Sequence, residues 1–218
     1  MSRASQAAPP EAAFDVMFIA DALTEVAGGA TDHEIALFSY LSCLLSVYRG
    51  RPPADWGYRF TATRLEAPYS DALSTAVKHL QAMGLLHGDK NGVHVTDRGK
   101  RELSLLSQLR RFASRTPYLS AACNSALAIP LPMVGTSLSA EPQLSRAIAL
   151  SSTRPLLDEV GARAIHGHFA ALSRALPDSS DLFVSAVVWL SYLARNLDDG
   201  AQDTSPNEQL DGRSAKCE

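Results

Sequence analysis

The stretch from Ala67 to Glu102, APYSDALSTAVKHLQAMGLLHGDKNGVHVTDRGKRE, contains the most regular pattern in the chain. Its first part predicts a helix that begins after Pro68-Tyr69, with Ser70 as the N-cap residue. Within this helix, apolar residues recur at spacings of four, three and three, which places them on one face. Because glycine adopts left-handed geometry without penalty, Gly84 is expected to end the helix. The apolar face consists of Leu73, Val77, Leu80 and Met83.

The second part of this stretch predicts a β-hairpin followed by another helix. Residues 85–87 read as a strand, residues 88–92 as a turn and residues 93–96 as the returning strand. Asn-Gly flanked by alternating apolar residues is a strong local signal for a hairpin. Thr96-Asp97 is expected to cap a helix that runs to Leu109. Basic residues then follow, which we interpret as favourable charges at the negative end of that helix dipole: Arg110, Arg111 and Arg115.

Two helices are expected before this stretch. From Glu11 to Val26 apolar residues recur at helical spacing, and Gly28-Gly29 ends the run. A second helix opens at Thr31 or Asp32, with Glu34 placed as in a capping box. This helix, at residues 31–49, is apolar on more than one face, which is typical of a helix buried in a core or at an interface.

A loop and a short strand are expected between the second helix and the stretch quoted above. Residues 49–58, RGRPPADWGY, contain two prolines and two glycines, so we expect no regular structure there. Residues 58–63, YRFTAT, alternate large and small side chains and suit a strand.

The pattern of Leu80–Gly99 resembles the recognition helix, wing and following helix of winged-helix proteins. Residues 58–70 are also similar to the strand, aromatic residue and proline of a bacterial branch with small accessory and antitoxin-like proteins. That branch usually has Gly-Pro where this chain has Ala67-Pro68. The resemblance covers roughly residues 30–110. It implies a winged-helix fold, and its motifs are structural rather than catalytic.

The composition changes after Pro117. Residues 118–140 are rich in Ser and Ala and contain Pro130 and Pro132, which predicts a short helix followed by an extended apolar segment. Further helices are expected at residues 141–151, 154–176 and 180–196, the last with a broad apolar face. From Asp198 onward the chain is polar and interrupted by Gly and Pro, and we expect disorder.

Bulk composition indicates an ordinary globular protein of 218 residues, with 46% hydrophobic and 20% charged residues. The formal net charge of -3 excludes a protein that coats nucleic acid through its overall charge. The N-terminus lacks the apolar region of a signal peptide, so we expect a cytoplasmic protein. We interpret Cys43, Cys123 and Cys217, which form no CxxC pair, as reduced thiols.

We find no sequence signature of an enzyme, a cofactor site or a metal site. The chain has no G-x-S-x-G nucleophile elbow, P-loop or dinucleotide fingerprint. His166 and His168 form the most metal-like fragment, but residues two apart on a helix point in roughly opposite directions. We therefore expect no catalytic residues, no bound cofactor and no metal ligands.

Double-stranded DNA and a partner protein are the two remaining candidates for binding. Residues 51–115 carry eleven cations and six anions, a net charge of +5, which permits contact with DNA. The predicted recognition helix, however, offers only Lys78 as a cation. Should DNA be bound, the expected contacts are Ser74, Lys78, His79 and Gln81 on the helix, Lys90 on the wing, and Arg98.

The sequence therefore predicts a mainly α-helical fold, a winged helix with a short β-hairpin wing and additional N- and C-terminal helices. The leading hypothesis is a non-enzymatic accessory or regulatory subunit that acts through protein–protein contacts, in a bacterial defence or toxin–antitoxin-type system. The alternative is a dimeric, sequence-specific DNA-binding transcription regulator. Surplus apolar helical surface also indicates self-association or a partner chain. The expected parts are a flexible N-terminus (1–10), an N-terminal helix (11–29), the winged helix (30–116), a helical region (117–197) and a disordered tail (198–218).

Overall fold

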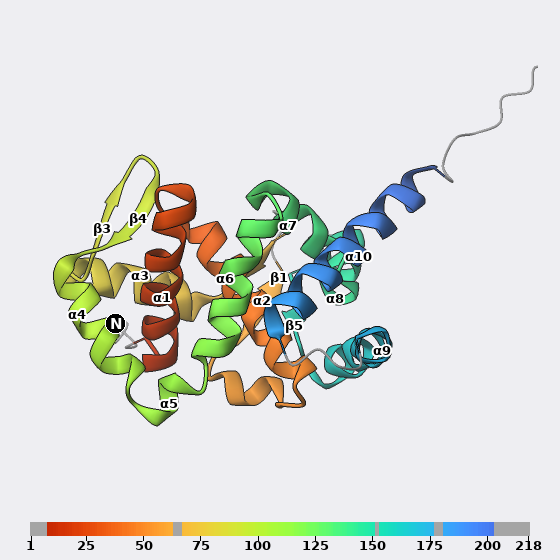
Figure 1. Cartoon of the computed structure of the whole chain (residues 1–218), viewed down its shortest axis with the longest axis horizontal. Helices are drawn as coiled ribbons and strands as arrows, with labels where there is room; N and C mark the ends of the chain where they lie inside the picture. Colours follow the sequence, from red (N-terminus) through yellow and green to blue (C-terminus); the bar gives the residue numbers. More distant parts are fainter. Residues whose placement is uncertain (1–7, 63–66, 151–152, 177–180, 203–218) are drawn as a thin grey trace, which may run out of the picture.

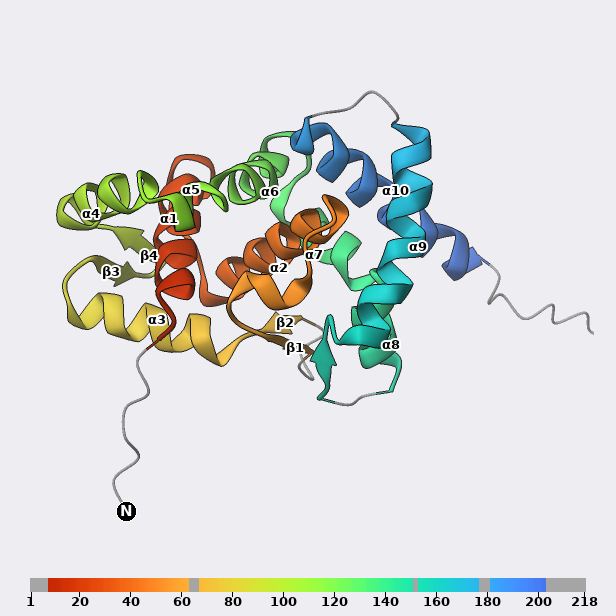
Figure 2. The same ribbon diagram turned by 90° about the horizontal axis from the view of Figure 1, so that it is seen from below.

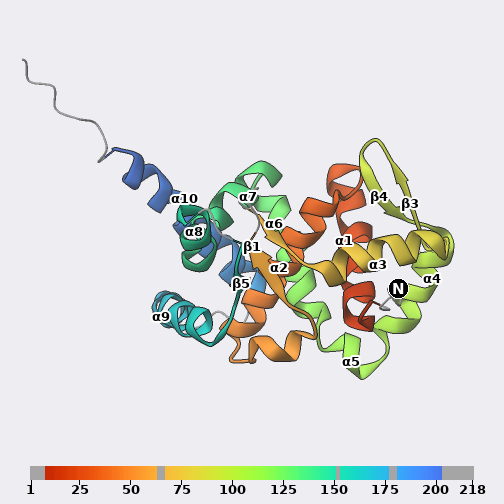
Figure 3. The same cartoon turned by 180° about the vertical axis from the view of Figure 1, so that it is seen from behind.

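Ten α-helices dominate the part of the chain that the structure describes (Figure 1). The computed structural model describes residues 8–62, 67–150, 153–176 and 181–202. The mainly helical fold predicted from the sequence is thus confirmed. The hairpin stands beside the first helix at one end of the molecule, and the last three helices gather toward the other end (Figures 1 and 3).

The first two helices begin and end at the residues that the sequence signals indicate. Helix α1 spans Pro10–Ala27 and ends at Gly28, which has a φ of 73°. Helix α2 spans Asp32–Tyr48, and its cap is a reciprocal pair between Thr31 and Glu34. The Thr31 backbone N–H donates to Glu34 Oε2 over 2.8 Å, and the Glu34 N–H donates to Thr31 Oγ1 over 3.2 Å. The capping box predicted from these residues is confirmed.

Helix α2 lies at the centre of the hydrophobic core. Every side chain from Ile35 to Val47 is buried, including the polar Ser39, Ser42 and Ser46. The two inner serine hydroxyls avoid the cost of burial by donating to backbone carbonyls of their own helix, Ser42 to Phe38 and Ser46 to Cys43. The expectation that this helix is buried is confirmed.

The segment between α2 and the next helix is more regular than we expected. Residues Pro53–Trp56 form a short 3-10 helix, η1, so the prediction of no regular structure at residues 49–58 was wrong. Proline at the first helical position is compatible with such a turn because it needs no N–H partner there. The chain continues as β1 (Phe60–Ala62) and β2 (Pro68–Tyr69), which pair antiparallel.

Helix α3 spans Asp71–Ala82 and buries Leu73, Val77 and Leu80, as its spacing predicts. The fourth predicted core residue, Met83, is 40% exposed. The helix has already ended at Ala82, and Gly84 at a φ of 68° turns the chain away from the core. The prediction for Met83 was therefore wrong, because helical periodicity does not extend past the last turn.

The hairpin pairs β3 (Leu86–Asp89) with β4 (Gly92–Val95), and Lys90 and Asn91 form its turn. Asp89 Oδ1 accepts the Asn91 backbone N–H over 2.7 Å, which stabilises the turn. Ala30, between α1 and α2, adds a bridge to the outer edge of β4. Its N–H donates to Val93 O over 3.2 Å and its carbonyl accepts the Val93 N–H over 2.8 Å.

Helix α4 (Asp97–Ser107) is capped by Thr96, whose Oγ1 accepts the Gly99 N–H. It ends two residues before the predicted Leu109, and Arg110 begins a separate short helix, α5 (Arg110–Ala113). Arg111 and Arg115 bind carboxylates of α1 instead of lying at the end of α4. Interpreting these two arginines as complements to the helix dipole was therefore wrong.

The C-terminal half adds five helices and one strand. The residues that we expected to be extended after the helix α6 (Thr116–Ala128) form a helix, α7 (Leu131–Ser139), so that prediction was wrong. Pro130 is the N-cap and Pro132 lies in the first turn, where proline is well tolerated. The remaining elements are α8 (Pro142–Ala149), β5 (Pro155–Leu156), α9 (Glu159–Ala175) and α10 (Leu182–Gln202).

Strand β5 ties the C-terminal half to the N-terminal half. It pairs antiparallel with β1, with Phe60 opposite Leu156, and completes a sheet in the order β2-β1-β5 (Figure 2). Helix α10 packs on α6 and α7. It continues to Gln202, so the prediction that this helix ends at Asn196 was wrong, as was the prediction of disorder for residues 198–202. The rest of the predicted tail, residues 203–218, lies outside the described residues.

Within the described residues, no single helix is both long and apolar enough to cross a membrane. Helices α6 and α7 are long and apolar enough for a membrane span only when they are counted as one segment. They are bent by 114° relative to each other.

Candidate functional site

The structure brings most of the predicted DNA-contacting residues to one exposed surface. Lys78, His79 and Gln81 are exposed on α3, opposite the side that carries Leu73 and Leu80. Ser74 is half-buried at the edge of the same helix, one turn before Lys78. Positions four and three apart are neighbours on a helix, so Ser74, Lys78 and Gln81 form a row.

The other two predicted residues lie on neighbouring elements. Lys90 is exposed at the tip of the hairpin. Arg98, in the first turn of α4, donates from Nη1 to the carbonyl of Met83 over 3.2 Å. This carbonyl belongs to the end of α3, where backbone oxygens lack helical partners and attract a cation. Arg98 therefore stabilises the end of α3 in addition to being exposed.

The surface formed by α3, the first turn of α2 and the hairpin has an excess of negative charge. We refer to it as the α2–α3 face. All of its residues belong to the described part of the chain, and it carries two lysines, Lys78 and Lys90. The carboxylates outnumber them and lie in the first turns of both helices and beside the hairpin turn: Asp32, Glu34, Asp71 and Asp89. Three of these carboxylates occupy helix N-termini, where the dipole favours negative charge.

A groove of about 200 Å³ lies on the α2–α3 face, between the start of α2, β2 and the start of α3. Its floor is apolar, and Asp32 and Tyr69 lie beside it. The Ser70 hydroxyl is buried beside the groove and has no hydrogen-bond partner among the described residues. Ser70 occupies the N-cap position of α3, but its side chain accepts no backbone N–H. The floor consists of Ile35, Ala36, Ala67, Pro68, Leu73 and Val77.

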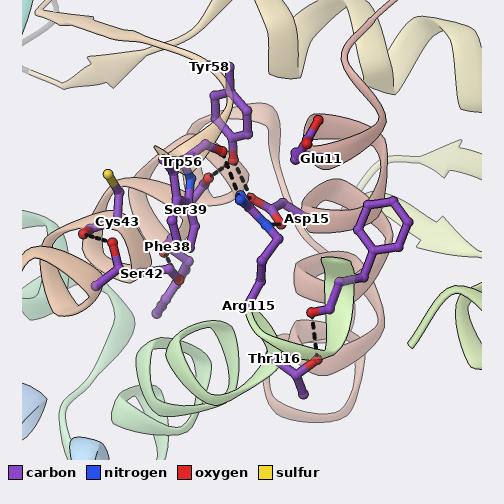
Figure 4. A network of polar contacts seen from close by, with 12 residues as sticks. Glu11, Asp15, Phe38, Ser39, Ser42, Cys43, Trp56, Tyr58, Arg115 and Thr116 are labelled. Carbon is purple, nitrogen blue, oxygen red and sulfur yellow. Dashed lines mark hydrogen bonds and ion pairs between the residues drawn. The ribbon is translucent and has the colours of Figure 1, made fainter. Parts of the chain in front are cut away.

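A second polar centre, which no sequence pattern predicted, is buried in the core (Figure 4). Asp15 of α1 is fully buried and binds the Arg115 guanidinium through both carboxylate oxygens, with Nε to Oδ1 at 2.9 Å and Nη2 to Oδ2. Tyr58 donates its hydroxyl to Asp15 Oδ2 over 2.5 Å. Ser39 contacts that same hydroxyl. No local pattern could reveal this centre, because Asp15 and Arg115 lie one hundred residues apart.

The remaining contacts of Arg115 complete its hydrogen bonding. Nη1 donates to the Trp56 carbonyl over 2.8 Å, and the guanidinium lies 3.8 Å from the centre of the Trp56 ring. Burial raises the pKa of Asp15 above its ordinary value, and the hydrogen bonds and charge of Arg115 act in the opposite direction. Because both oxygens of Asp15 are engaged by protein donors, this centre holds α1, η1 and α6 together and leaves no base available for a substrate.

A metal site is not apparent in the described ranges. No group of three or more His, Cys, Asp or Glu side chains there could hold an ion. His87 and His94 stack across the hairpin with ring centres 4.9 Å apart, and Asp89 lies 3.1 Å from His94. Their proximity follows from the strand register, which places His87 directly opposite His94.

The comparisons with known proteins assign no relative to this chain. No family model, no curated protein and no solved structure matches it.

Proposed function

We propose that residues 10–107 form a winged-helix module, which includes helix α1 and ends before α5, in place of the residues 30–116 predicted from the sequence. The order of elements supports this: α1, the bridging residue Ala30, α2, α3 and then the hairpin β3–β4. Ala30 pairs with Val93 in an isolated bridge, at the place where a third strand would join a wing sheet. In this assignment α3 is the recognition helix, and η1, β1 and β2 form an insertion before it.

We further propose that the module is a non-enzymatic accessory or regulatory subunit that docks a partner protein, as the resemblance to accessory and antitoxin-like winged-helix proteins implies. The observation that carries this proposal is the negative charge of the α2–α3 face. DNA presents a dense row of phosphates, and helix N-termini are natural sites for them. Here the N-termini of α2 and α3 already hold the carboxylates of Asp32, Glu34 and Asp71, which repel phosphate.

The groove on the same face suits a protein partner. Its apolar floor and its volume of about 200 Å³ match one large apolar side chain of a docking segment. Asp32 and Asp71 beside the groove favour a segment with a basic residue next to the apolar one.

Duplex binding tests the proposal directly. We expect the wild-type protein to bind no duplex DNA at physiological salt, and only weakly at low salt. The double variant Lys78→Glu/Lys90→Glu should therefore change little. Lys100→Glu is the matched control, because Lys100 lies away from this face, 3.6 Å from Asp21. Tight binding that Lys78→Glu/Lys90→Glu abolishes and Lys100→Glu retains would contradict the proposal.

A photo-crosslinking experiment tests for docking itself. A benzophenone amino acid replaces Tyr69, which is 38% exposed beside the groove, or Leu105 on α4, which is 60% exposed. We expect an adduct with one protein from the native host at position 69 and none at position 105. The complex should then form from the two purified proteins. Equal adducts at both positions, or no complex on reconstitution, would argue against docking at this face.

A DNA-binding regulator is the second candidate. The exposed row of Ser74, Lys78 and Gln81 on α3 favours it, since these side chains reach bases or phosphates in a major groove. A DNA-binding regulator would bind duplex DNA with an affinity that falls steeply as the salt concentration rises, because each neutralised phosphate releases counterions. The same duplex titration at low and physiological salt therefore separates the two candidates.

A further inference from the structure

The last helix, α10, carries a row of apolar side chains that the core does not use. Large apolar side chains are exposed at eleven positions in the described ranges, and α10 holds three of them, while no other described helix holds more than one. Single exposed apolar residues are normal in a monomer, whereas a contiguous row is typical of a surface that binds another protein. The three residues are Val184, Val188 and Tyr192, with exposed fractions of 37%, 37% and 50%.

The opposite side of α10 is fixed in the core. Trp189 is buried, and its ring packs on the Phe169 ring of α9 at a centre-to-centre distance of 5.2 Å. Helix α10 also packs on α6 and α7. Residues four apart lie on the same side of a helix, so Val184, Val188 and Tyr192 share the side that faces solvent. The surface that they form is therefore held in place by the core and open to a partner.

An acidic and a basic residue extend this row at its two ends. Asp181 directly precedes α10, Arg195 follows fourteen residues later, and both are exposed. The spacings along the row are three, four, four and three, so the row is symmetric about its central residue. At about 100° per residue, the five side chains fall within an arc of about 80°. We refer to them as the α10 stripe: Asp181, Val184, Val188, Tyr192 and Arg195.

We propose that the α10 stripe binds the α10 stripe of a second copy of this chain, with the two helices antiparallel. A two-fold axis at Val188 places this residue beside its own counterpart. The same axis places Val184 beside Tyr192 of the second copy, and Asp181 beside Arg195 of the second copy. Each apolar side chain then meets an apolar one, and each charge meets its opposite. A parallel pair would instead bring like charges together at both ends.

The symmetry of the α10 stripe favours a second copy over an unrelated protein. A two-fold interface requires a surface that is complementary to itself, and an unrelated partner does not. One helix pair buries less area than a permanent dimer interface, so we expect a weak dimer with a Kd of about 1–100 μM. Helix α10 lies at the other end of the molecule from α3 and the hairpin (Figures 1 and 2), so the inference does not depend on what the α2–α3 face binds.

Sedimentation velocity of the full chain tests the dimer at concentrations from about 1 to about 500 μM, a range that spans the expected Kd. The wild type should change from monomer to dimer as its concentration rises. Val188→Glu places two carboxylates at the axis and should weaken the dimer about one hundredfold or more. Leu105→Glu is the matched control, because Leu105 is equally apolar and exposed but lies on α4. It should keep the wild-type affinity.

Two results of this experiment would overturn the proposal. A wild type that stays monomeric over the whole range would leave the α10 stripe to a different protein. Equal weakening by Val188→Glu and Leu105→Glu would show that the chain associates without using the stripe.

A charge reversal tests the antiparallel arrangement. Arg195→Glu places a carboxylate beside Asp181 of the second copy at both ends of the pair, and should weaken the dimer about tenfold at low ionic strength. Added salt should weaken the wild-type dimer and strengthen the Arg195→Glu dimer, because it screens attraction in one and repulsion in the other. Arg59→Glu makes the same change in net charge at an exposed position outside the stripe, and should have little effect. An Arg195→Glu dimer as tight as the wild type would contradict the antiparallel pair.

Discussion

Arg115 immediately precedes α6 and donates two hydrogen bonds to Asp15 of α1, one hundred residues earlier in the chain. Both side chains are buried, and Tyr58 and Ser39 extend the contact to the loop after η1 and to α2. Four separate segments thus meet at one ion pair. This relationship fixes where the C-terminal helices attach to the first three helices.

Removing one side chain of the Asp15–Arg115 ion pair should strongly destabilise the protein. Asp15→Ala leaves the Arg115 guanidinium buried without its anion, and we expect the free energy of unfolding to fall by about 3–5 kcal/mol. Urea denaturation followed by circular dichroism measures this change. The control is Asp21→Ala, which breaks the surface ion pair with Lys100 and should cost at most about 1 kcal/mol. Equal losses in the two variants would show that the buried pair has no special role.

A second buried carboxylate should make stability depend on pH. Glu141 caps α8 by accepting the N–H groups of Gln143 and Leu144, and it also accepts the hydroxyl of Tyr40. Burial nevertheless raises the pKa of Glu141 above its ordinary value of 4.5. The folded state therefore holds this proton more tightly than the unfolded state does.

Because folding is linked to proton binding, the raised pKa of Glu141 sets the direction in which stability changes with pH. The favourable contribution of Glu141 is complete below about pH 4.5 and is lost as the pH rises through its folded-state pKa. The stability of the wild type relative to Glu141→Gln should thus decrease from pH 4 toward pH 7. Unfolding free energies measured across this range test it, with the exposed Glu102→Gln as control. A difference that grows with pH would contradict this prediction.

The two N-caps that flank the α2–α3 groove should respond differently to alanine. Thr31→Ala removes a hydrogen bond to the Glu34 N–H and should destabilise the protein by about 1 kcal/mol. Ser70→Ala removes a buried hydroxyl that has no partner in the described part of the chain, so it should be neutral or slightly stabilising. Thermal and urea unfolding of the two variants measure this contrast. A loss for Ser70→Ala as large as that for Thr31→Ala would mean that Ser70 caps α3 in solution.

The bridge between Ala30 and the hairpin can be tested through Gly92. Its φ is 129°, and a Cβ there would lie 2.4 Å from the Ala30 carbonyl oxygen. Gly84 also has a positive φ, 68°, but a Cβ there would meet nothing within 4 Å. Gly84→Ala should therefore cost about 1–2 kcal/mol from backbone strain alone. Gly92→Ala should carry an additional cost of about 1–3 kcal/mol from overcrowding.

Equilibrium urea unfolding of the two glycine variants provides the measurement. Should Gly92→Ala prove no more destabilising than Gly84→Ala, the close contact between Ala30 and the hairpin would not persist in solution.

Much of the local structure could be predicted from the sequence. Gly28, Thr31 and Thr96 each mark a helix boundary through contacts within a few residues, and Asn91-Gly92 marks the hairpin in the same way. The α7 helix was missed because Pro130 and Pro132 suggested an extended chain. Proline breaks a helix in its interior and is tolerated at its start, so the prediction depended on where the helix begins.

The exposed candidates on α3 could also be predicted, because helical spacing places Ser74, Lys78 and Gln81 on one side once Leu73 and Leu80 are assigned to the core. The excess negative charge of the surface around these side chains could not be predicted in this way. It depends on Asp32, thirty-nine residues before the first residue of α3, lying beside the start of that helix.

The sequence by itself determined most of the helices, the caps at Gly28, Thr31 and Thr96, and the hairpin, because these depend on hydrogen bonds and side-chain contacts between residues a few positions apart. Only the tertiary structure decided that Arg115 binds Asp15 and that β5 pairs with β1. The physical reason is distance along the chain. A buried charge requires a partner, but sequence separation leaves the choice of partner open until packing brings one specific side chain within a few ångströms.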